Sequence, residues 1–335
     1  MKNCKIKNSK AYNPYAQNQI AIGKTGLKAF KLGFGAGVVG TSMMYPKVDD
    51  TLSRQLIRTA LAKGINFIDT AFLYGMGHSE ELIGEAIRDY GGREHLVIST
   101  KASSNPQFNQ GHLEVDNSPA ALRKAVDDSL MRLQTDYVDI FFLHFPDSRT
   151  PLAEAADTLA ELKKSGKIKA IGASNLSFEQ LQAFNADKHL DVLQAEYSLL
   201  VRHAEADVIP YCLEHEISLI PFFPLASGLL AGKYKKDDVF NDTSRMNNPL
   251  FQKEAFLANL ERVDRFKVFA KDKGVDPAQI ALAWLLTRPA VDLIISGATK
   301  PDQIESNLQT LGVRLTSDEL KQLDILLNQD NLFTE

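Results

Sequence analysis

Residues 65–75 read INFIDTAFLYG. The stretch starts with the apolar content of a parallel strand that is covered on both faces, and then places Asp69 at its end and Tyr74 just beyond it. Two later apolar runs end in a similar way, since LVISTKAS carries Lys101 and VDIFFLHFPD carries His144. Ionisable groups are costly in such positions unless they are used. An acid, a phenol, an amine and an imidazole at one rim of a parallel sheet therefore predict a proton-transfer site.

Eight short apolar runs alternate with amphipathic stretches along the chain. The amphipathic stretches, such as TLSRQLIRTALAKG and SPAALRKAVDDSLMRL, repeat apolar residues at helical spacing. Because a strand–helix–strand crossover is right-handed, eight such units predict an α/β fold of the (β/α)8 TIM barrel type. The predicted strands are Phe30–Phe34, Ile65–Ile68, Leu96–Thr100, Val138–Leu143, Ile168–Gly172, Val192–Ala195, Ile217–Phe222 and Leu293–Ile295.

Several segments fall outside the strand–helix repeat. Residues 19–31 are predicted to form a β-hairpin that plugs the bottom of the barrel, and residues 1–18 to have no fixed structure. Amphipathic patterns at 254–274 and 317–328 predict two extra helices. Because no Pro/Gly-rich linker divides the chain, we expect residues 19–335 to form a single domain.

Serines and glycines mark the predicted helix boundaries. Ser79, Ser118 and Ser177 precede helical patterns and are candidates for N-caps. Gly91 and Gly166 follow such patterns, where a left-handed cap is needed.

Composition narrows the class of protein. The 335 residues carry a formal net charge of −4 with interspersed signs, so nucleic acid is not an expected partner. The two cysteines, Cys4 and Cys212, have no paired spacing, which argues against a disulfide framework or a zinc site. No apolar run approaches the roughly 20 residues that span a bilayer, and the N-terminus lacks a secretory pattern. We expect a cytoplasmic protein with no membrane partner, either a monomer or a weak homo-oligomer.

The chemistry of the four rim residues follows from their pKa values. A free phenol titrates near ~10, too high for efficient acid–base catalysis at neutral pH. Lys101 beside Tyr74 would lower the phenol pKa, and Asp69 would keep Lys101 charged. His144 would orient a carbonyl oxygen, to which Tyr74 would donate its proton. Each residue alone has a structural explanation, as a cap, packing or core residue, but four together favour a site. Since the site has no nucleophile of its own, it needs an external reductant such as a nicotinamide cofactor.

A series of motifs resembles the aldo-keto reductase family, in that family's order. They are FIDTAFLYGMGHSEELIG, VISTKAS, DYVDIFFLHFPD, KIKAIGASN, VLQAEYSLL, FFPLASGLLAGKY and SGATKPDQIESN. The resemblance extends from Gly23 to the final helix and is closest to bacterial reductases of the inositol-operon-associated type. It implies a reductase of aldehydes or ketones, including sugar-like substrates, that uses NADPH, with Tyr74 as general acid.

The resemblance also implies cofactor contacts. Ser174, Asn175 and Gln194 match residues that hold the nicotinamide carboxamide, and Phe222 matches the aromatic residue that stacks on its ring. Asp69 belongs to the cofactor end of the site as well, and Gly35 and Ala36 follow the first strand near the cofactor. The residues matching the pyrophosphate loop and the adenosine end are Phe223, Pro224, Leu225, Ala226, Ser227, Gly228, Lys233, Arg245, Gly297, Thr299, Gln303, Ser306 and Asn307.

One adenosine-end position departs from many relatives. Gln303 stands where many of them have arginine, so it supplies no charge for a 2′-phosphate. Lys300 and Arg245 are the nearby cations that could compensate.

Three other functions remain open from the residues. A metal-dependent hydrolase would need a pattern such as His-x-His, which none of the seven histidines forms, so no metal is expected. A Schiff-base aldolase would use Lys101 as nucleophile, but that needs a lowered lysine pKa and Asp69 acts against it. A cofactor-sensing regulatory subunit with slow turnover would retain the same residues. Substrate choice is expected to lie in rim loops, chiefly 102–117 and 237–254, and in the C-terminal tail, with pocket candidates Tyr45, Phe72, Phe108 and His112.

Overall fold

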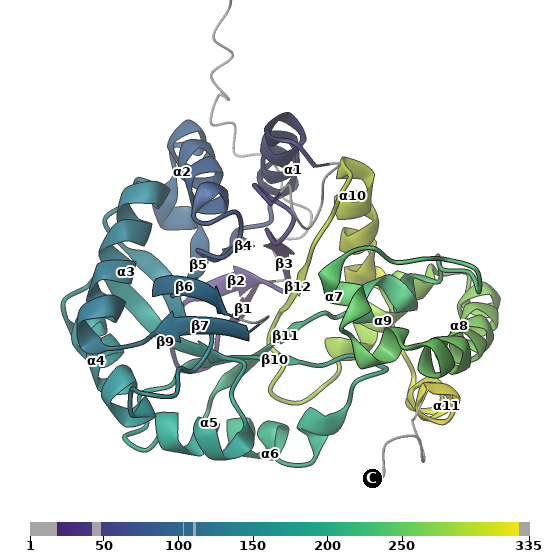
Figure 1. The fold of residues 1–335 in the computed structure, drawn as a ribbon. Coiled ribbons are helices and arrows are strands. Elements are labelled where there is room, and N and C mark those ends of the chain that lie inside the picture. The colour runs from purple at the N-terminus through teal and green to yellow at the C-terminus, as the bar shows by residue number, and fades with distance from the viewer. Residues whose placement is uncertain (1–18, 42–47, 103, 110–111, 328–335) are drawn as a thin grey trace, which may run out of the picture.

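The computed structural model describes residues 19–41, 48–102, 104–109 and 112–327, and its centre is a ring of parallel strands (Figure 1). The strand order is β11-β10-β9-β8-β5-β4-β3-β12, and each neighbouring pair is parallel. The barrel strands are β3 (Leu32–Gly35), β4 (Phe67–Asp69), β5 (Val97–Ala102), β8 (Val138–Leu143), β9 (Ile168–Ser174), β10 (Val192–Glu196), β11 (Ser218–Phe222) and β12 (Ile294–Ser296).

The ring closes between β11 and the segment just before β12. Leu219 forms an isolated parallel bridge with Val291, and its N–H donates to the carbonyl of Ala290 at 2.8 Å. The predicted (β/α)8 barrel is therefore confirmed. Because the ring is closed, the C-terminal ends of all eight strands meet at one rim.

The predicted first strand, Phe30–Phe34, is wrong at its start. Phe30 ends β2 (Lys28–Phe30), which pairs with β1 (Gln19–Ala21), and β3 begins only at Leu32. The apolar run is continuous in sequence, but Phe30 faces Gln19 of the hairpin, whereas Leu32 faces Ile294 of the barrel. Two sheets share one run, which periodicity alone cannot divide.

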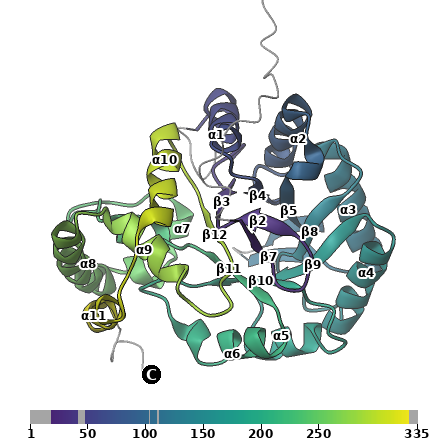
Figure 2. The ribbon, with the colours of Figure 1, turned by 180° about the vertical axis from the view of Figure 1, so that it is seen from behind.

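The N-terminal hairpin closes the bottom of the barrel, as predicted. Ile22 and Ala29 have no exposed surface and pack against Phe67, Val97 and Ile140 inside the ring. Seen from behind, β2 lies across the opening (Figure 2). Among the described residues, the interior is thus filled at the N-terminal ends of the strands, which leaves the opposite rim for a ligand.

Helices surround the ring on its outer side (Figure 1). Those following the barrel strands are α1 (Asp50–Ala62), α2 (His78–Tyr90), α3 (Pro119–Leu133), α4 (Leu152–Lys164), α5 (Phe178–Phe184), α6 (Val208–Glu214), α9 (Pro277–Leu285) and α10 (Pro301–Gln309). Ser118 and Ser177 cap α3 and α5 as predicted, by accepting from the N–H groups of Ala121 and Gln180.

The predicted N-cap at Ser79 is wrong, because α2 begins one residue earlier, at His78. Gly77 takes the cap position with φ 96°, and Ser79 lies within the first turn with no exposed surface. Its hydroxyl lies 2.8 Å from the hydroxyl of Thr70, on the barrel. The serine joins the helix to a strand end instead of capping the helix.

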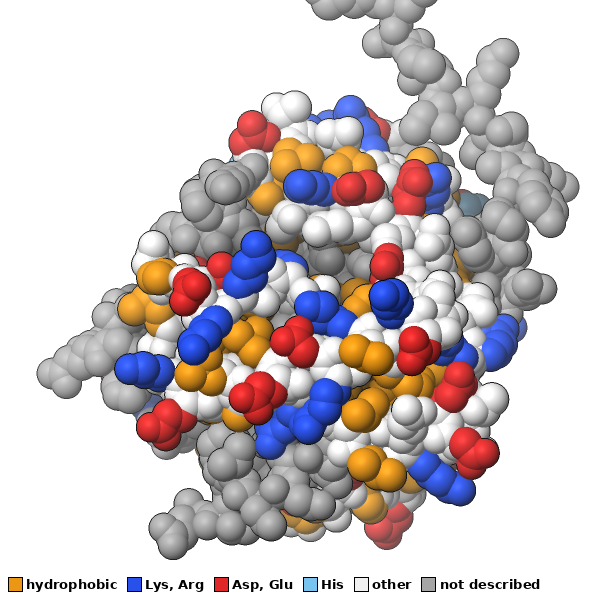
Figure 3. All heavy atoms as spheres, turned by 90° about the vertical axis from the view of Figure 1, so that its right-hand side faces the viewer, with side chains coloured by type: hydrophobic (Ala, Val, Ile, Leu, Met, Phe, Trp, Pro, Cys, Tyr) orange, Lys and Arg blue, Asp and Glu red, His pale blue; other side chains and the backbone are white. Residues whose placement is uncertain are grey.

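Within the described residues, three further α-helices and a second hairpin lie outside the repeat. The two predicted extra helices are present as α8 (Lys253–Lys273) and α11 (Ser317–Leu327), and α7 (Thr243–Met246) is short. Acidic, basic and apolar side chains are interspersed on the side of the molecule that carries α8 and α11 (Figure 3). Strands β6 (Ser104–Asn109) and β7 (His112–Asp116) form an antiparallel hairpin after β5, in a segment expected to be a loop. No helix within the described ranges is both long and apolar enough to cross a membrane.

Candidate active site

Asp69 and Lys101 form a buried ion pair at the C-terminal rim. They end or nearly end the neighbouring strands β4 and β5, and Lys101 Nζ lies 2.7 Å from Asp69 Oδ2. Nζ also donates to the carbonyl of Thr70 at 2.8 Å. The other carboxylate oxygen, Oδ1, accepts from Ser99 Oγ at 2.7 Å and from Gln194 Nε2 at 2.8 Å. Because each charged group is hydrogen-bonded to several neighbours, the two charges are held in fixed positions.

Ser99 was missed from the sequence, although a signal was present. It lies two residues before Lys101 on the same strand, so side-chain alternation places both on the inner face. Like Asp69, it is buried.

Tyr74 lies beside this pair in the turn between β4 and α2. Its ring centroid is 5.2 Å from Lys101 Nζ. Gly37 approaches closely on the other side, where a β-carbon would lie 3.7 Å from the ζ-carbon of Tyr74. Burial would lower the pKa of Lys101, but the charges of Asp69 and Tyr74 and hydrogen bonds with both outweigh burial and raise that pKa. The amine stays an ammonium, which argues against its use as a Schiff-base nucleophile.

His144 completes the cluster directly after β8. Its ring stands edge-on to that of Tyr74, with 6.4 Å between centroids and 89° between planes. Burial, aided by the positive charge of Lys101, lowers the pKa of His144 well below its usual range. The imidazole is therefore neutral at physiological pH, which lets one ring nitrogen donate a hydrogen bond without adding a charge.

The residues matched to the nicotinamide end lie at three adjacent strand ends. Ser174 ends β9, Gln194 lies on β10 and Phe222 ends β11. Asn175 follows Ser174 with φ 57°, and its amide donates to the carbonyl of His144 at 2.9 Å. These contacts tie the predicted nicotinamide residues to the proton-transfer cluster.

A cavity of about 280 Å³ lies beyond β11 and β12 at the same rim. The structure brings together most residues that the resemblance assigned to the far end of the cofactor. Those in its lining are Phe223, Pro224, Leu225, Ser227, Gly228, Lys233, Arg245, Gly297, Thr299, Gln303, Ser306 and Asn307. The sequence did not indicate the other lining residues, Val38, Ala231, Ala278, Ser296 and Ala298.

Apart from Asp69 and the residues matched to the nicotinamide end, three assigned residues lie outside that lining. Ala226 is buried, and Ala36 is buried with its N–H donating to the carbonyl of Asp69 at 2.8 Å. Gly35 lies against Gly297, whose backbone nitrogen would be 3.5 Å from a β-carbon at Gly35. These residues do not line the cavity.

The cavity is suited to an anionic group. Lys233 and Arg245 both line it, and burial together with the charge of Arg245 lowers the pKa of Lys233. Tyr234 accepts from Arg245 Nε at 2.9 Å and donates to the carbonyl of Ser227 at 2.8 Å, which positions both. The hydroxyl of Ser227 is buried and has no hydrogen-bond partner within the described chain. An unpartnered hydroxyl beside two cations fits a bound pyrophosphate or phosphate.

Gln303 lines the cavity near the start of α10, where the resemblance predicts the adenosine end of the cofactor. Its Oε1 accepts from the N–H groups of Thr299 at 2.7 Å and of Lys300 at 3.2 Å. Asn307 donates to Ser296 Oγ at 3.0 Å and links α10 to the end of β12. The glutamine therefore orders the backbone at the start of α10.

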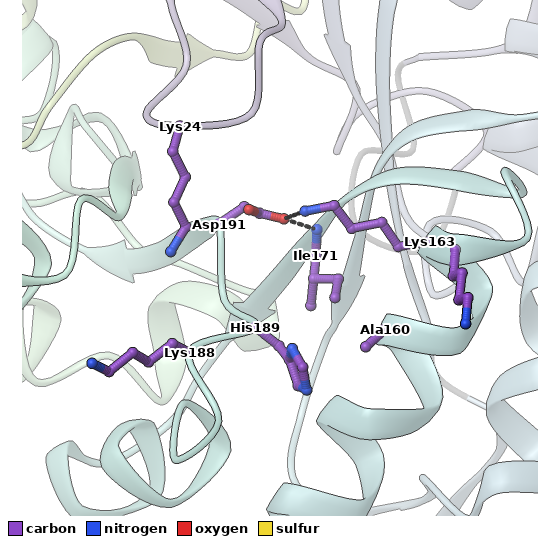
Figure 4. A pocket seen from close by; sticks show the side chains of 8 residues that line it. Lys24, Ala160, Lys163, Ile171, Lys188, His189 and Asp191 are labelled. Carbon is purple, nitrogen blue, oxygen red and sulfur yellow. Dashed lines mark hydrogen bonds and ion pairs between the residues drawn. The ribbon is translucent and has the colours of Figure 1, made fainter.

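A second, shallower hollow of about 490 Å³ lies at the plugged end of the barrel (Figure 4). Lys24 of the hairpin turn, Lys163, Lys188 and Asp191 line it. Asp191 Oδ2 is already satisfied by Lys163 Nζ at 2.6 Å and by the N–H of Ile171 at 2.8 Å. The lysines point in different directions (Figure 4). This hollow lacks convergent groups and is far from the rim cluster. Among the described residues, no group of three or more His, Cys, Asp or Glu side chains could hold a metal ion.

The chain belongs to the aldo/keto reductase family, whose model matches residues 31–328. It is therefore an NAD(P)-dependent oxidoreductase that acts on carbonyl or alcohol groups. The family match agrees with the buried pair, the neighbouring phenol and the cavity lined by Lys233 and Arg245 described above. The finer resemblance to inositol-operon-associated reductases stays a prediction.

Three curated relatives illustrate the range of the family. Aldo-keto reductase YhdN of Bacillus subtilis is 37% identical over 309 residues, which cover 92% of each chain. The NADH-specific methylglyoxal reductase of Escherichia coli is 33% identical and covers 89% of this chain and 94% of its own. A probable voltage-gated potassium channel subunit beta of Arabidopsis thaliana is 34% identical, with coverage of 87% and 90%.

Two solved structures are similar in fold and length. The glycerol dehydrogenase AKR11B4 of Gluconobacter oxydans has a TM-score of 0.84 and 33% identity, covering 96% of this chain and 99% of its own. An aldo-keto reductase of Klebsiella pneumoniae in complex with NADPH has a TM-score of 0.69 and 28% identity, with coverage of 92% and 95%.

Proposed function

We propose that this protein reduces small aldehydes or ketones to alcohols with NADPH, and that Tyr74 donates the proton. The observation that carries the proposal is the position of the Tyr74 ring close to both Lys101, whose pKa is raised, and His144, whose pKa is lowered. The nearby cavity with Lys233 and Arg245 would hold the cofactor phosphates. NADPH in the related Klebsiella structure supports this choice of cofactor.

Each residue of the rim cluster has a separate role in the proposed reaction. The cofactor, when bound, supplies a hydride to the carbonyl carbon. Tyr74 gives its hydroxyl proton to the carbonyl oxygen as negative charge develops there, so the product is a neutral alcohol. Lys101 stabilises the phenolate that remains, and Asp69 holds Lys101 in place. His144 donates a hydrogen bond to the same oxygen and fixes its direction.

The direct test is NADPH oxidation across a panel of aldehydes and ketones, including sugar-like ones, with NADH in parallel. We expect turnover with several small carbonyl compounds and a higher kcat/KM with NADPH than with NADH. If the protein reduces none of these compounds, the proposal is wrong.

A cofactor-sensing subunit is the second candidate, favoured by the similarity to a probable potassium channel subunit beta. It would bind NADPH tightly but oxidise it at a negligible rate across the whole panel. Fluorescence titration of NADPH together with the rate measurement separates the two functions.

A further inference from the structure

The first turn of α2 is hydrogen-bonded to both strand ends that carry the buried ion pair. Thr70 follows Asp69, and Thr100 precedes Lys101. Because side chains alternate along extended backbone, the threonines face outward where the ion pair faces inward. The hydroxyl of Thr70 lies 2.8 Å from Ser79 Oγ, and the hydroxyl of Thr100 donates to Glu80 Oε1 at 2.6 Å.

Glu80 is itself part of a second buried ion pair. Its side chain has no exposed surface, and its Oε2 accepts from Arg132 Nε, on α3, at 2.6 Å. The guanidinium of Arg132 lies 4.9 Å from the ring centroid of Phe72, in the turn that holds Tyr74. The N–H of Ser79 donates to the carbonyl of Tyr74 at 3.1 Å. Glu80, with its neighbours, thus reaches the strand of Lys101 and the turn of Tyr74.

Stability is a weak explanation for this second pair. Moving two charges out of water costs free energy, and the attraction between them often does no more than offset that cost. A buried ion pair is therefore often no more stabilising than apolar packing of the same volume. Its contacts instead reach the side chains of Thr100, next to Lys101, and of Phe72, in the turn that holds Tyr74. Geometry is the property that such contacts can fix.

We propose that Glu80, held by Arg132, is a positioning residue that sets the distance between Lys101 and Tyr74. The inference rests on the proposed role of Tyr74 as proton donor. Glu80 anchors Thr100 and therefore the backbone of Lys101, while Ser79 anchors Thr70 and the backbone of Tyr74. A displacement of about 1 Å between reacting groups can cost about 10²-fold in rate.

The test uses the full chain with the double substitution Glu80→Gln/Arg132→Met. Replacing both partners avoids a lone buried charge. We expect kcat for carbonyl reduction to fall about 10²-fold, with KM and Kd for NADPH changed less than about twofold. The pH at which kcat declines on the alkaline side should move upward, because the ammonium would stabilise the phenolate less well.

A matched control is available in another buried ion pair. Asp139 and Arg93 lie 2.7 Å apart with side chains 2% and 14% exposed, against 0% and 19% for Glu80 and Arg132. Asp139 lies near the start of β8 and Arg93 lies just before β5, so both are at the plugged end of the barrel. Asp139→Asn/Arg93→Met should lower Tm without moving the alkaline limb. Equal losses of kcat in both double variants, or an unmoved limb in the Glu80 variant, would overturn the proposal.

A milder variant protects the test against a failure to fold. Thr100→Val removes only the hydroxyl that donates to Glu80, and we expect kcat to fall about tenfold with the same upward movement of the limb. An unchanged kcat and limb in a folded Thr100→Val protein would contradict the proposal. The variant Tyr74→Phe distinguishes a failure of the proposed function from a failure of the positioning role. If Tyr74→Phe stays active, Tyr74 is not the proton donor and the positioning role of Glu80 is wrong as well. If Tyr74→Phe is inactive while the Glu80 variant matches its control, only the positioning role is wrong.

Discussion

Lys101 Nζ lies 2.7 Å from Asp69 Oδ2, and the side chains of both residues are only 2% exposed. The second oxygen of Asp69 accepts from Ser99 and Gln194, and the ammonium also donates to the carbonyl of Thr70. Neither charge can turn toward water. This fixed positive charge lies 5.2 Å from the centroid of the Tyr74 ring.

Replacing Tyr74 by phenylalanine should remove proton donation and leave the fold intact. We expect kcat for carbonyl reduction to fall about 10²–10⁴-fold, because a positioned acid contributes about that factor. NADPH affinity, measured by fluorescence titration, should stay near the wild-type value. A variant that keeps more than about a tenth of the wild-type kcat would show that another group supplies the proton.

Lys101→Met should lower stability as well as activity, because it leaves the Asp69 carboxylate buried without its cation. The expected loss in the free energy of unfolding is about 3–5 kcal/mol. The double variant Asp69→Asn/Lys101→Met should recover most of that loss but remain inactive. Urea denaturation monitored by fluorescence measures both. Equal stability of the single and double variants would mean that Asp69 finds another partner.

His144 should make stability depend on pH. Its pKa is lowered by burial in the folded protein, whereas in the unfolded chain it takes up a proton near ~6.5. Below that pH the unfolded state binds more protons, so the free energy of unfolding should fall as pH decreases, by up to about 1.4 kcal/mol per pH unit. His144→Phe should show a shallower dependence between about pH 5 and 7. Identical slopes for both proteins would contradict a neutral His144.

Lys233 should contribute to cofactor affinity through its charge. Burial and Arg245 lower the pKa of Lys233, and an anionic pyrophosphate in the cavity would raise it again. We expect Lys233→Ala to raise KM for NADPH about tenfold with a small change in kcat. Lys236→Ala, three residues further in the same segment and outside the cavity lining, is the control and should leave KM unchanged. A similar KM in both variants would place the phosphates elsewhere.

Gln303→Glu tests where the 2′-phosphate lies. The carboxylate can still accept from the N–H groups of Thr299 and Lys300, so the backbone should stay in place while a negative charge is added. We expect kcat/KM with NADPH to fall about tenfold or more and that with NADH to change little. Equal changes with both cofactors would show that the 2′-phosphate lies away from Gln303.

Patterns of apolar residues along the sequence were sufficient to predict most of the barrel. Apolar runs located each barrel strand to within a few residues, since a buried parallel strand must be apolar on both faces. They failed at Phe30, where one run serves two sheets, and at Ser79, whose hydroxyl bonds a strand end instead of capping a helix. The β6/β7 hairpin was also missed, because its strands read as a polar loop. Tyr45 and residues 1–18 lie outside the described residues, as do the side chains of Phe108 and His112.

The sequence by itself determined the barrel, the family and the four rim residues, because strand periodicity and the order of motifs are properties of neighbours along the chain. Only the tertiary structure showed that Ser99 and Gln194 both bond Asp69, that Lys233 and Arg245 share one cavity, and that Glu80 reaches the strand of Lys101. The hydrogen bonds among these relationships join residues 20 to 125 positions apart. They arise only when the ring closes and brings separate strands to one rim.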